Sequence, residues 1–195
     1  FNCAGLPGNM PLLDVMKVNY LAVRKVTQAV APLLNEGSGV ASISSTAGNA
    51  WMMRLATHLE LAATPDFASG LEWCEGNIDQ IFESYSFGKE ALIVWTMKEA
   101  SHLIKRGIRL NCIGAGAIES NGFNNYREEN VSTFYSCNPM KRAGDVQDIA
   151  EAVVYLAAPS GKFITGEVLN VEGGMLLWGE FWPAGKPDYF KVDQP

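Results

Sequence analysis

The sequence is poor in positive charge and has no closely spaced cysteines. Its 15 Lys and Arg residues stand against 21 Asp and Glu, giving a formal net charge of -6 with no basic cluster, so we expect no nucleic-acid partner. The four cysteines are Cys3, Cys74, Cys112 and Cys137. They lack the close pairing of a zinc site and the density of a disulfide-stapled domain. We therefore expect reduced thiols, a cytoplasmic location and no bound metal.

The sequence also has no long apolar run. None approaches the roughly 18 to 20 residues of a membrane-spanning helix, and the first residues lack a basic segment followed by an apolar one. We therefore expect no membrane partner. Because 48% of the residues are hydrophobic and 18% are charged, one substantial core can be buried, and we interpret residues 1–195 as a single domain.

Helical and strand patterns alternate along the chain. Helices are predicted at residues 14–34, 85–106 and 145–157. The first helix has apolar residues at helical spacing, which predicts a buried stripe of Val15, Val18, Ala22, Val26, Ala29 and Leu33. Short apolar runs predict strands in "GVASISS", "IRLNCIGAG" and "ITGEVLNVEGG", at residues 39–45, 108–116 and 164–174. This order predicts an α/β fold with a parallel sheet covered on both faces.

Residues 49–83 interrupt the alternation. They contain helical spacing, as in "WMMRLATHLELAATPDF" and "LEWCEGNIDQIFE", but no strand pattern. Structureless stretches of this length are uncommon inside a compact domain. We therefore predict an inserted helical segment at 49–83.

Five polar or small residues are candidates for a functional site. Tyr85 and Lys89 are one helical turn apart, so both project from the same helix face. Ser45 and Gly116 end predicted strands, where ligands bind in α/β sheets. Asn19 lies on an apolar stripe, where a buried amide needs hydrogen-bond partners. Taken alone, the tyrosine and lysine also fit an ordinary exposed helix face, and the serine fits a turn at a strand end.

Five motifs together resemble the short-chain dehydrogenase/reductase family. They are "FNCAG", "VNYLA", "ISSTAG", "YSFGK" and "CIGAGAIES", at residues 1–5, 18–22, 43–48, 85–89 and 112–120. The resemblance implies a Rossmann-like, doubly wound parallel sheet, with the helical insertion placed before the catalytic tyrosine. It implies an oxidoreductase that transfers hydride between NAD or NADP and an alcohol or ketone.

The resemblance also implies catalytic roles. Tyr85 is the expected general acid or base, and Lys89 the cation that favours its ionised form. At about 6 Å and an effective dielectric near 20, their attraction is about 3 kcal/mol, or about two pKa units. Ser45 is expected to hydrogen bond the substrate oxygen, and Asn19 to hold a water that relays protons to Lys89.

Cofactor-binding positions follow from the same resemblance. Lys89 is expected to hydrogen bond the nicotinamide ribose, close to Tyr85. The other positions expected to bind the cofactor are Asn2, Ala4, Gly5, Gly116, Ile118 and Ser120. Cys3 and Ala115 depart from the family pattern, where an asparagine and a proline are usual.

The family's glycine-rich phosphate loop precedes the segment that matches residues 1–5. We therefore expect this chain to be a fragment that lacks the N-terminal strands of the cofactor half. The alternative is a truncated, non-catalytic remnant that acts as an oligomerisation or interaction module. A serine hydrolase is disfavoured because no G-x-S-x-G elbow is present and neither His58 nor His102 has a recognisable partner.

The long spacing between Ser45 and Tyr85 narrows the resemblance. Forty positions separate them, which is similar to the bacterial 3α-hydroxysteroid dehydrogenase/carbonyl reductase and coniferyl alcohol dehydrogenase group. This similarity implies a hydrophobic secondary alcohol or ketone, of steroid or aryl type, as substrate. It also implies a homo-oligomer, a dimer or tetramer. Two aromatic sets are candidates for substrate cover or subunit contact: Phe123, Tyr126, Phe134 and Tyr135, and Trp178, Phe181, Trp182, Tyr189 and Phe190.

Overall fold

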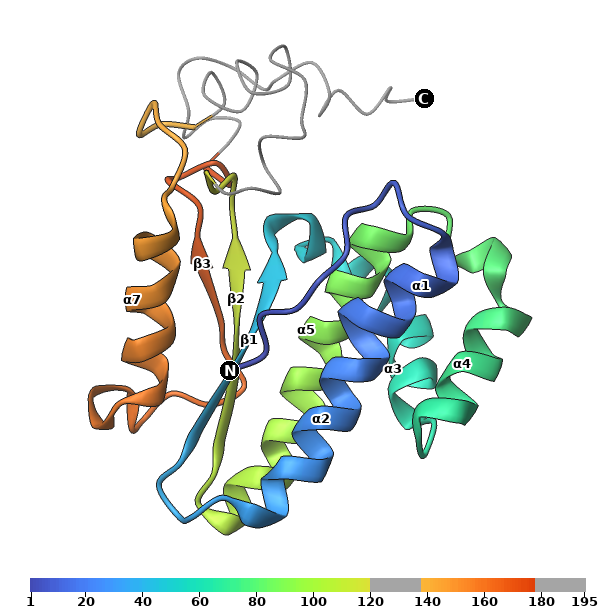
Figure 1. Ribbon diagram of the computed structural model, residues 1–195, viewed down its shortest axis with the longest axis horizontal. Coiled ribbons are helices and arrows are strands. Elements are labelled where there is room, and N and C mark those ends of the chain that lie inside the picture. Colours follow the sequence, from blue (N-terminus) through green and yellow to red (C-terminus); the bar gives the residue numbers. More distant parts are fainter. Residues whose placement is uncertain (120–137, 178–195) are drawn as a thin grey trace.

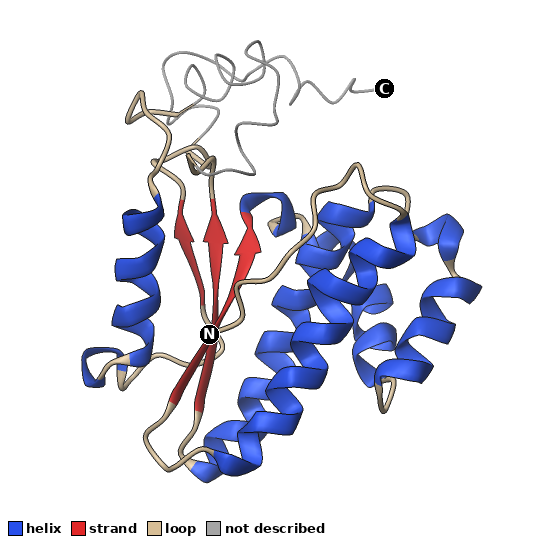
Figure 2. Cartoon of the chain, in the orientation of Figure 1, coloured by secondary structure: helices blue, strands red, loops and turns tan. Residues whose placement is uncertain are grey.

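The computed structural model describes residues 1–119 and 138–177. Within them lies a parallel sheet with helices on both faces (Figure 1, Figure 2). Its strands are β1 (Gly39–Ser45), β2 (Arg109–Ala115) and β3 (Val168–Val171), in the order β1-β2-β3 and all parallel. Their carboxyl ends therefore meet at one edge of the sheet. The predicted parallel α/β architecture is confirmed.

One face of the sheet is covered by α7 (Val146–Ala157), followed by η8 (Pro159–Gly161). The helix begins as predicted, because Asp145 accepts hydrogen bonds from its first turn in a capping box. Arg109 joins this helix to β2. Its buried guanidinium donates to the carbonyl oxygens at the end of the helix, those of Leu156, Ala157, Ala158 and Gly161.

The opposite face is covered by α5 (Ser84–Leu103), which continues into η6 (Ile104–Arg106). Gly107 stops this helix with a left-handed φ of 70°, which a glycine adopts without strain. The helix is buried along most of its length between the sheet and other helices. Within the described ranges, no helix combines the length and the apolar character needed to cross a bilayer.

The first helical run differs from its prediction. It consists of α1 (Leu12–Met16), the π-helix η1 (Lys17–Ala22), α2 (Val23–Val30) and η2 (Ala31–Leu33). A π turn holds more residues than an α turn, so it rotates the residues that follow it about the axis. The buried face is therefore Met16, Tyr20, Val23, Thr27 and Ala31.

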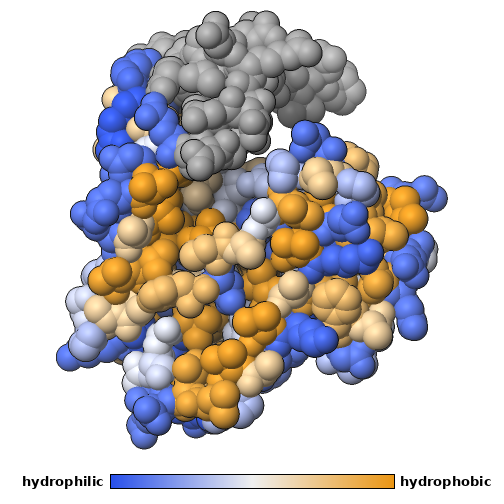
Figure 3. Space-filling view, viewed as in Figure 1, coloured by the Kyte–Doolittle hydropathy of each residue, from blue (hydrophilic) through white to orange (hydrophobic). Residues whose placement is uncertain are grey.

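The predicted apolar stripe is correspondingly wrong in its second half. Its members Val26, Ala29 and Leu33 are exposed, Leu33 by 80%. Hydrophobic side chains gather on this face of the molecule over α2 (Figure 3). The structure therefore leaves an apolar helix face in contact with solvent.

The segment between β1 and α5 is helical, as predicted. It contains η3 (Thr46–Gly48), η4 (Trp51–Arg54), α3 (Leu55–Ala63), α4 (Phe67–Gly76) and η5 (Ile78–Gln80). Its buried residues belong to the same hydrophobic cluster as those of α1 and α5. The inserted helices therefore extend the layer of helices on that face of the sheet.

Candidate active site

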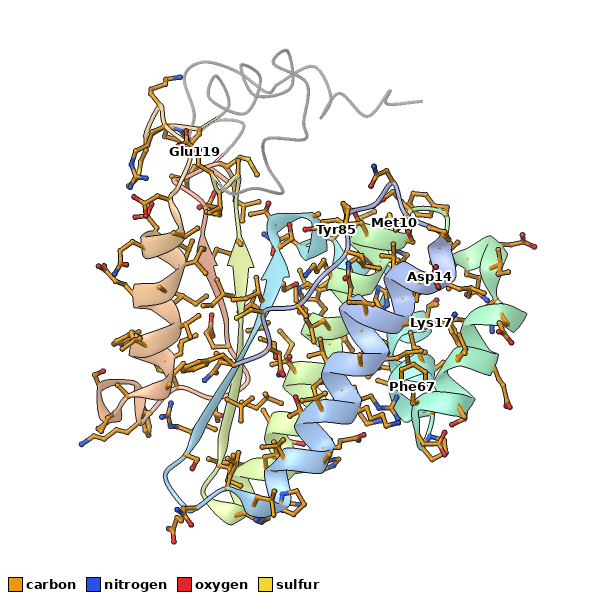
Figure 4. All side chains as sticks on the ribbon, in the orientation of Figure 1. Met10, Asp14, Lys17, Phe67, Tyr85 and Glu119 are labelled. Atoms are coloured by element: carbon orange, nitrogen blue, oxygen red, sulfur yellow. The ribbon has the colours of Figure 1, made fainter. Side chains whose placement is uncertain are left out.

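Tyr85 and Lys89 lie on the first two turns of α5. Glu83 caps this helix, because its carboxylate accepts a hydrogen bond of 2.8 Å from the backbone N–H of Ser86. Tyr85 is half-buried, and Figure 4 places it at the end of α5 that faces the carboxyl end of β1. The Nζ of Lys89 lies 5.6 Å from the centroid of the Tyr85 ring. The structure thus brings the two side chains together on one helix face.

Three contacts fix Lys89 to the end of β1. Its Nζ donates a hydrogen bond of 2.8 Å to the carbonyl oxygen of Ile43. Its own carbonyl oxygen accepts one of 3.0 Å from the hydroxyl of Ser44. Gly48 packs against it so closely that a Cβ there would lie 3.0 Å from the carbonyl carbon of Lys89. The turn that carries Lys89 is therefore positioned by the strand on which Ser45 lies.

The two adjacent serines have different roles. Ser44 uses its hydroxyl to tie β1 to α5. Ser45 caps η3, where its Oγ accepts a hydrogen bond of 3.2 Å from the backbone N–H of Ala47. A hydroxyl that accepts in this way keeps its own proton to donate. Ser45 is therefore the serine whose O–H can serve a ligand oxygen.

Asn19 is 1% exposed and lies in the π-helix η1. Both ends of its amide bind the backbone of Leu6: Oδ1 accepts from the N–H at 2.7 Å, and Nδ2 donates to the carbonyl at 2.9 Å. This pairing satisfies the buried amide without a water. It also holds Gly5 at the site, since a Cβ on Gly5 would lie 3.4 Å from Oδ1 of Asn19 and 3.8 Å from Nζ of Lys89. The water relay through Asn19 stays a prediction.

The N-terminal segment passes directly over the tyrosine. A Cβ on Gly8 would lie 3.1 Å from the Cβ of Tyr85, closer than most side chains allow. Met10, which Figure 4 labels on the same segment, is 43% exposed. Residues 5–8 therefore form one wall of the site.

Burial controls the charge of Lys89. The side chain is only 5% exposed, and loss of hydration lowers its pKa from 10.5 to about 8, although nearby Cys112 acts in the opposite direction. Burial also raises the pKa of the Cys112 thiol to about 12, so this thiol is neutral at pH 7. Lys89 is therefore still an ammonium at pH 7, and the neutral thiol of Cys112 does not balance its charge.

The first residues of the chain lie along the outer edge of β1. Asn2 pairs with Ser42 in a parallel bridge, and its Nδ2 donates to the hydroxyls of Thr27 and Ser42 at 2.9 and 3.0 Å. These bonds within the chain already account for the amide of Asn2. Ala4 and Gly5 are exposed and can meet a ligand.

The segment after β2 carries the other expected cofactor residues. Gly116 needs no ligand to explain it, because a Cβ there would lie 2.7 Å from the Cα of Glu172 beside it. Ile118 forms a bridge with Gly144 that uses the backbone groups of its neighbours, Ala117 C=O and Glu119 N–H. The N–H and C=O of Ile118 are thus left out of this bridge. Ser120 and both predicted aromatic sets lie outside the described residues.

A pocket of about 340 Å³ opens beside Ile118, at the carboxyl ends of β2 and β3. Arg142, Asp148 and Asn170 contribute to its lining, and Lys89 does not. Arg142 donates hydrogen bonds to Asp148, and these bonds lower the pKa of that carboxyl to about 2. The strand ends thus have the pair of Tyr85 and Lys89 near β1 and a concave surface near β3.

Comparison with known proteins accounts for this arrangement. Residues 77–176 match a family model described as enoyl-(acyl carrier protein) reductase. The chain is 30% identical over 177 residues to coniferyl-alcohol dehydrogenase of a Pseudomonas species, covering 89% of this chain and 69% of that protein. The chain belongs to the short-chain dehydrogenase/reductase family. The resemblance drawn from the five motifs is confirmed.

Solved structures of this short-chain dehydrogenase/reductase family share the fold. The 3α-hydroxysteroid dehydrogenase of Pseudomonas sp. B-0831, complexed with NADH, has a TM-score of 0.73 and 26% identity, over 89% of this chain and 70% of that one. A short-chain dehydrogenase of Burkholderia cenocepacia in complex with NADP has a TM-score of 0.66 and 26% identity, over 90% and 64%. These likenesses confirm the Rossmann-like fold. The chain spans about two thirds of the length of these family members.

Sequence reasoning missed two kinds of contact in this family site. The carbonyl of Ile43 and the backbone of Leu6 are partners of Lys89 and Asn19, but backbone atoms leave no trace in residue identity. Glu90 was also missed, although a carboxylate directly before the apolar run "ALIVW" of α5 is a visible signal of a buried partner.

Proposed function

We propose that the protein is an NAD(P)-dependent oxidoreductase that transfers hydride between the nicotinamide and a hydrophobic secondary alcohol or ketone. The observation that carries this proposal is the buried ammonium of Lys89, 5.6 Å from the ring centroid of Tyr85 at the end of the strand that bears Ser45. Family membership supports the reaction class.

Tyr85 is the proposed proton donor in ketone reduction and the acceptor in alcohol oxidation. A free tyrosine, with a pKa near 10, is too weak an acid for this task at pH 7. The ammonium of Lys89 favours the phenolate, and for charges about 6 Å apart the attraction is about 3 kcal/mol at an effective dielectric near 20. Lys89 therefore acts on the acidity of Tyr85 as long as it stays protonated.

Ser45 is the proposed hydrogen-bond donor to the substrate oxygen. Its position at the end of β1, with a proton left to donate, supports this role. Asn19 is proposed to hold a water that relays protons to Lys89, and its hydrogen bonds to the backbone of Leu6 keep its amide beside Gly5.

The residues around this site fit a nicotinamide cofactor. Lys89 spends one of its three N–H donors on Ile43, which leaves donors for a ribose. Gly5 presents bare backbone beside Lys89, and Ile118 has backbone groups outside its bridge for a carboxamide. The bound nicotinamide supplies or takes the hydride, while the chain binds and orients it. The positions proposed for the cofactor are Asn2, Ala4, Gly5, Tyr85, Lys89, Gly116, Ile118 and Ser120.

The substrate class rests on relatives and on local chemistry. The relatives named above act by name on coniferyl alcohol and on a hydroxysteroid, which are both alcohols that carry carbon rings. Met10 adds an exposed apolar side chain to the segment that passes over Tyr85. We further propose a cytoplasmic homo-oligomer, a dimer or tetramer. The free thiols of Cys3, Cys74 and Cys112 support the location, and the exposed apolar face of α2 supports the assembly.

A nicotinamide-absorbance assay of the full-length protein with steroids and aryl alcohols tests the proposal. Tyr85→Phe is expected to lower kcat by about 10²- to 10⁴-fold with an unchanged circular dichroism spectrum. Tyr155→Phe is the matched control, because this tyrosine is 45% exposed on α7. Unaffected turnover in Tyr85→Phe would remove the tyrosine from the mechanism.

A further inference from the structure

A buried charged cluster lies on the side of α5 that faces the inserted helices. Its members are Arg54 at the end of η4, His58 on α3 and Glu90 on α5. His58 and Glu90 are both 0% exposed. Glu90 directly follows Lys89, so the cluster binds the same helical turn that carries the Lys89 amine.

The contacts within this cluster are directional. The Nε of Arg54 donates to one carboxylate oxygen of Glu90 at 2.9 Å, and its Nη2 donates to the other. The Nε2 of His58 lies 2.7 Å from a carboxylate oxygen of Glu90. Burial raises the pKa of Glu90, but the hydrogen bonds from His58 and Arg54 outweigh it and hold the pKa below its ordinary value. Glu90 is therefore ionised at pH 7.

The only hydrogen bond of the His58 ring within the described residues is the one to Glu90. Its other ring nitrogen, Nδ1, is buried and has no hydrogen-bond partner in the part of the chain that the structure describes. A buried polar atom without a partner costs stability. The ring is nevertheless fixed, because it packs 4.6 Å from the ring of Phe87 on the first turn of α5.

The first turns of α5 are thus held from two directions. On one side, Ile43, Ser44 and Gly48 contact Lys89 from β1 and η3. On the other side, Arg54 and His58 contact Glu90 from the inserted helices. A helix held only from the sheet side can tilt or rotate about that contact, whereas one held from both sides cannot.

We propose that Glu90 is a positioning residue through which the inserted helices set the orientation of Tyr85 and Lys89. The inference rests on the proposed oxidoreductase function of that pair. Arg54 and His58 act with Glu90 as one unit, and none of the three touches the substrate. The inserted helices therefore contribute to catalytic geometry as well as to the surface.

The test compares Glu90→Gln and Arg54→Met with a control. Glu90→Gln keeps the side-chain volume and removes the charge. Arg54→Met removes the guanidinium from a side chain that is 27% exposed. This variant is therefore expected to fold even if Glu90→Gln does not. The control is Arg24→Met: Arg24 is buried and binds Thr64 and Leu61 at the far end of α3, so it anchors the same segment away from α5.

Two readouts are measured on the full-length protein. The first is the split between kcat and KM. The second is hydrogen exchange of the backbone amides at residues 84–90, which does not depend on turnover. Positioning predicts that Glu90→Gln and Arg54→Met each lower kcat by about tenfold to a hundredfold, with KM changed by less than about twofold, and speed exchange at 84–90. The double variant is expected to be no worse than either single variant, because the residues act as a unit.

The control separates positioning from stability. Arg24→Met is expected to lower the free energy of unfolding while kcat and exchange at 84–90 stay as in the wild type. If the control lowers kcat as much as Glu90→Gln, or if Glu90→Gln leaves both readouts unchanged, the proposal is overturned. If the wild type turns over no alcohol or ketone, the proposed function fails, and exchange at 84–90 still decides whether the cluster orders this turn.

Discussion

Replacement of Lys89 by methionine should stabilise the protein at pH 7 while it destroys activity. The native state carries this ammonium almost fully buried, and its pKa falls from 10.5 to about 8 as a result. At 1.36 kcal/mol per pKa unit, the native state loses about 3 kcal/mol by holding the charge. Lys89→Met also deletes the hydrogen bond to Ile43, which contributes about 1 kcal/mol. The net gain at pH 7 is therefore about 2 kcal/mol.

The stability difference between Lys89→Met and the wild type should depend on pH. The folded pKa lies below the unfolded one, so the cost is present in full below pH 8, declines as pH rises from about 8 to 10.5, and is absent above 10.5. The advantage of Lys89→Met is therefore largest at pH 7 and disappears at about pH 10, where the remaining cost equals the contribution of the lost hydrogen bond. Urea unfolding of both proteins at pH 7, 9 and 10, followed by the fluorescence of buried Trp95, measures this trend.

Two results would refute the reasoning. The first is a Lys89→Met variant that is less stable than the wild type at pH 7, which would mean that the hydrogen bond to Ile43 outweighs the burial of charge. The second is a stability difference that does not change between pH 7 and 10, which would mean that Lys89 titrates at its ordinary pKa in the folded protein.

Three further expectations concern the same site. Ser45→Ala should lower kcat by about a hundredfold or more with little change in stability, whereas Ser44→Ala should lower the free energy of unfolding by about 1 kcal/mol and leave most of kcat; equal losses of kcat would contradict the division of roles. The kcat/KM for ketone reduction should fall above pH about 8, as Lys89 loses its proton; a flat profile from pH 7 to 10 would exclude the ammonium from the step. Gly48→Ala should cost about 1 to 3 kcal/mol in thermal or urea unfolding, because its new Cβ would lie 2.9 Å from Cδ1 of Ile93, and an unchanged midpoint would show that this approach can relax.

The elements of the fold were predictable because each has a local signal. The strands β1, β2 and β3 appear as short apolar runs that end in small residues, and the structure has them at those places. Gly107 and Asp145 marked the end of one helix and the start of another. Such signals depend only on neighbours in sequence, so they remain valid in the folded chain.

The buried face of the first helical run was not predictable in the same way. A stripe read at 3.6 residues per turn assumes an unbroken α-helix, and the π turn at η1 (Lys17–Ala22) shifts that register. Val26 and Leu33 therefore lie on the exposed face, while polar Thr27 is buried and bonded to Asn2. No residue type in "KVNYLA" announces a π turn.

The proximity of the candidate site residues was predictable from the sequence, and their contacts were not. Tyr85, Lys89, Ser45 and Asn19 were found from motif spacing, and the structure brings Lys89 beside both the tyrosine and the strand end. The partners that fix them are backbone atoms or come from the inserted helices. The depressed pKa of Lys89 depends on three-dimensional burial, which the spacing does not contain.

The guanidinium of Arg109 lies among backbone carbonyl oxygens at the end of α7. Its Nη1 is 2.9 Å from the carbonyl oxygen of Gly161, and its Nη2 is 3.0 Å from the carbonyl oxygen of Ala157. Carbonyl oxygens do not titrate, so acid does not neutralise these contacts between β2 and α7. The contacts on the other side of the sheet rely on a carboxylate, Glu90, that acid neutralises. Acidification should therefore destabilise one face of the sheet first: the helices at 51–80 are expected to dissociate from α5 while α7 stays packed on the strands.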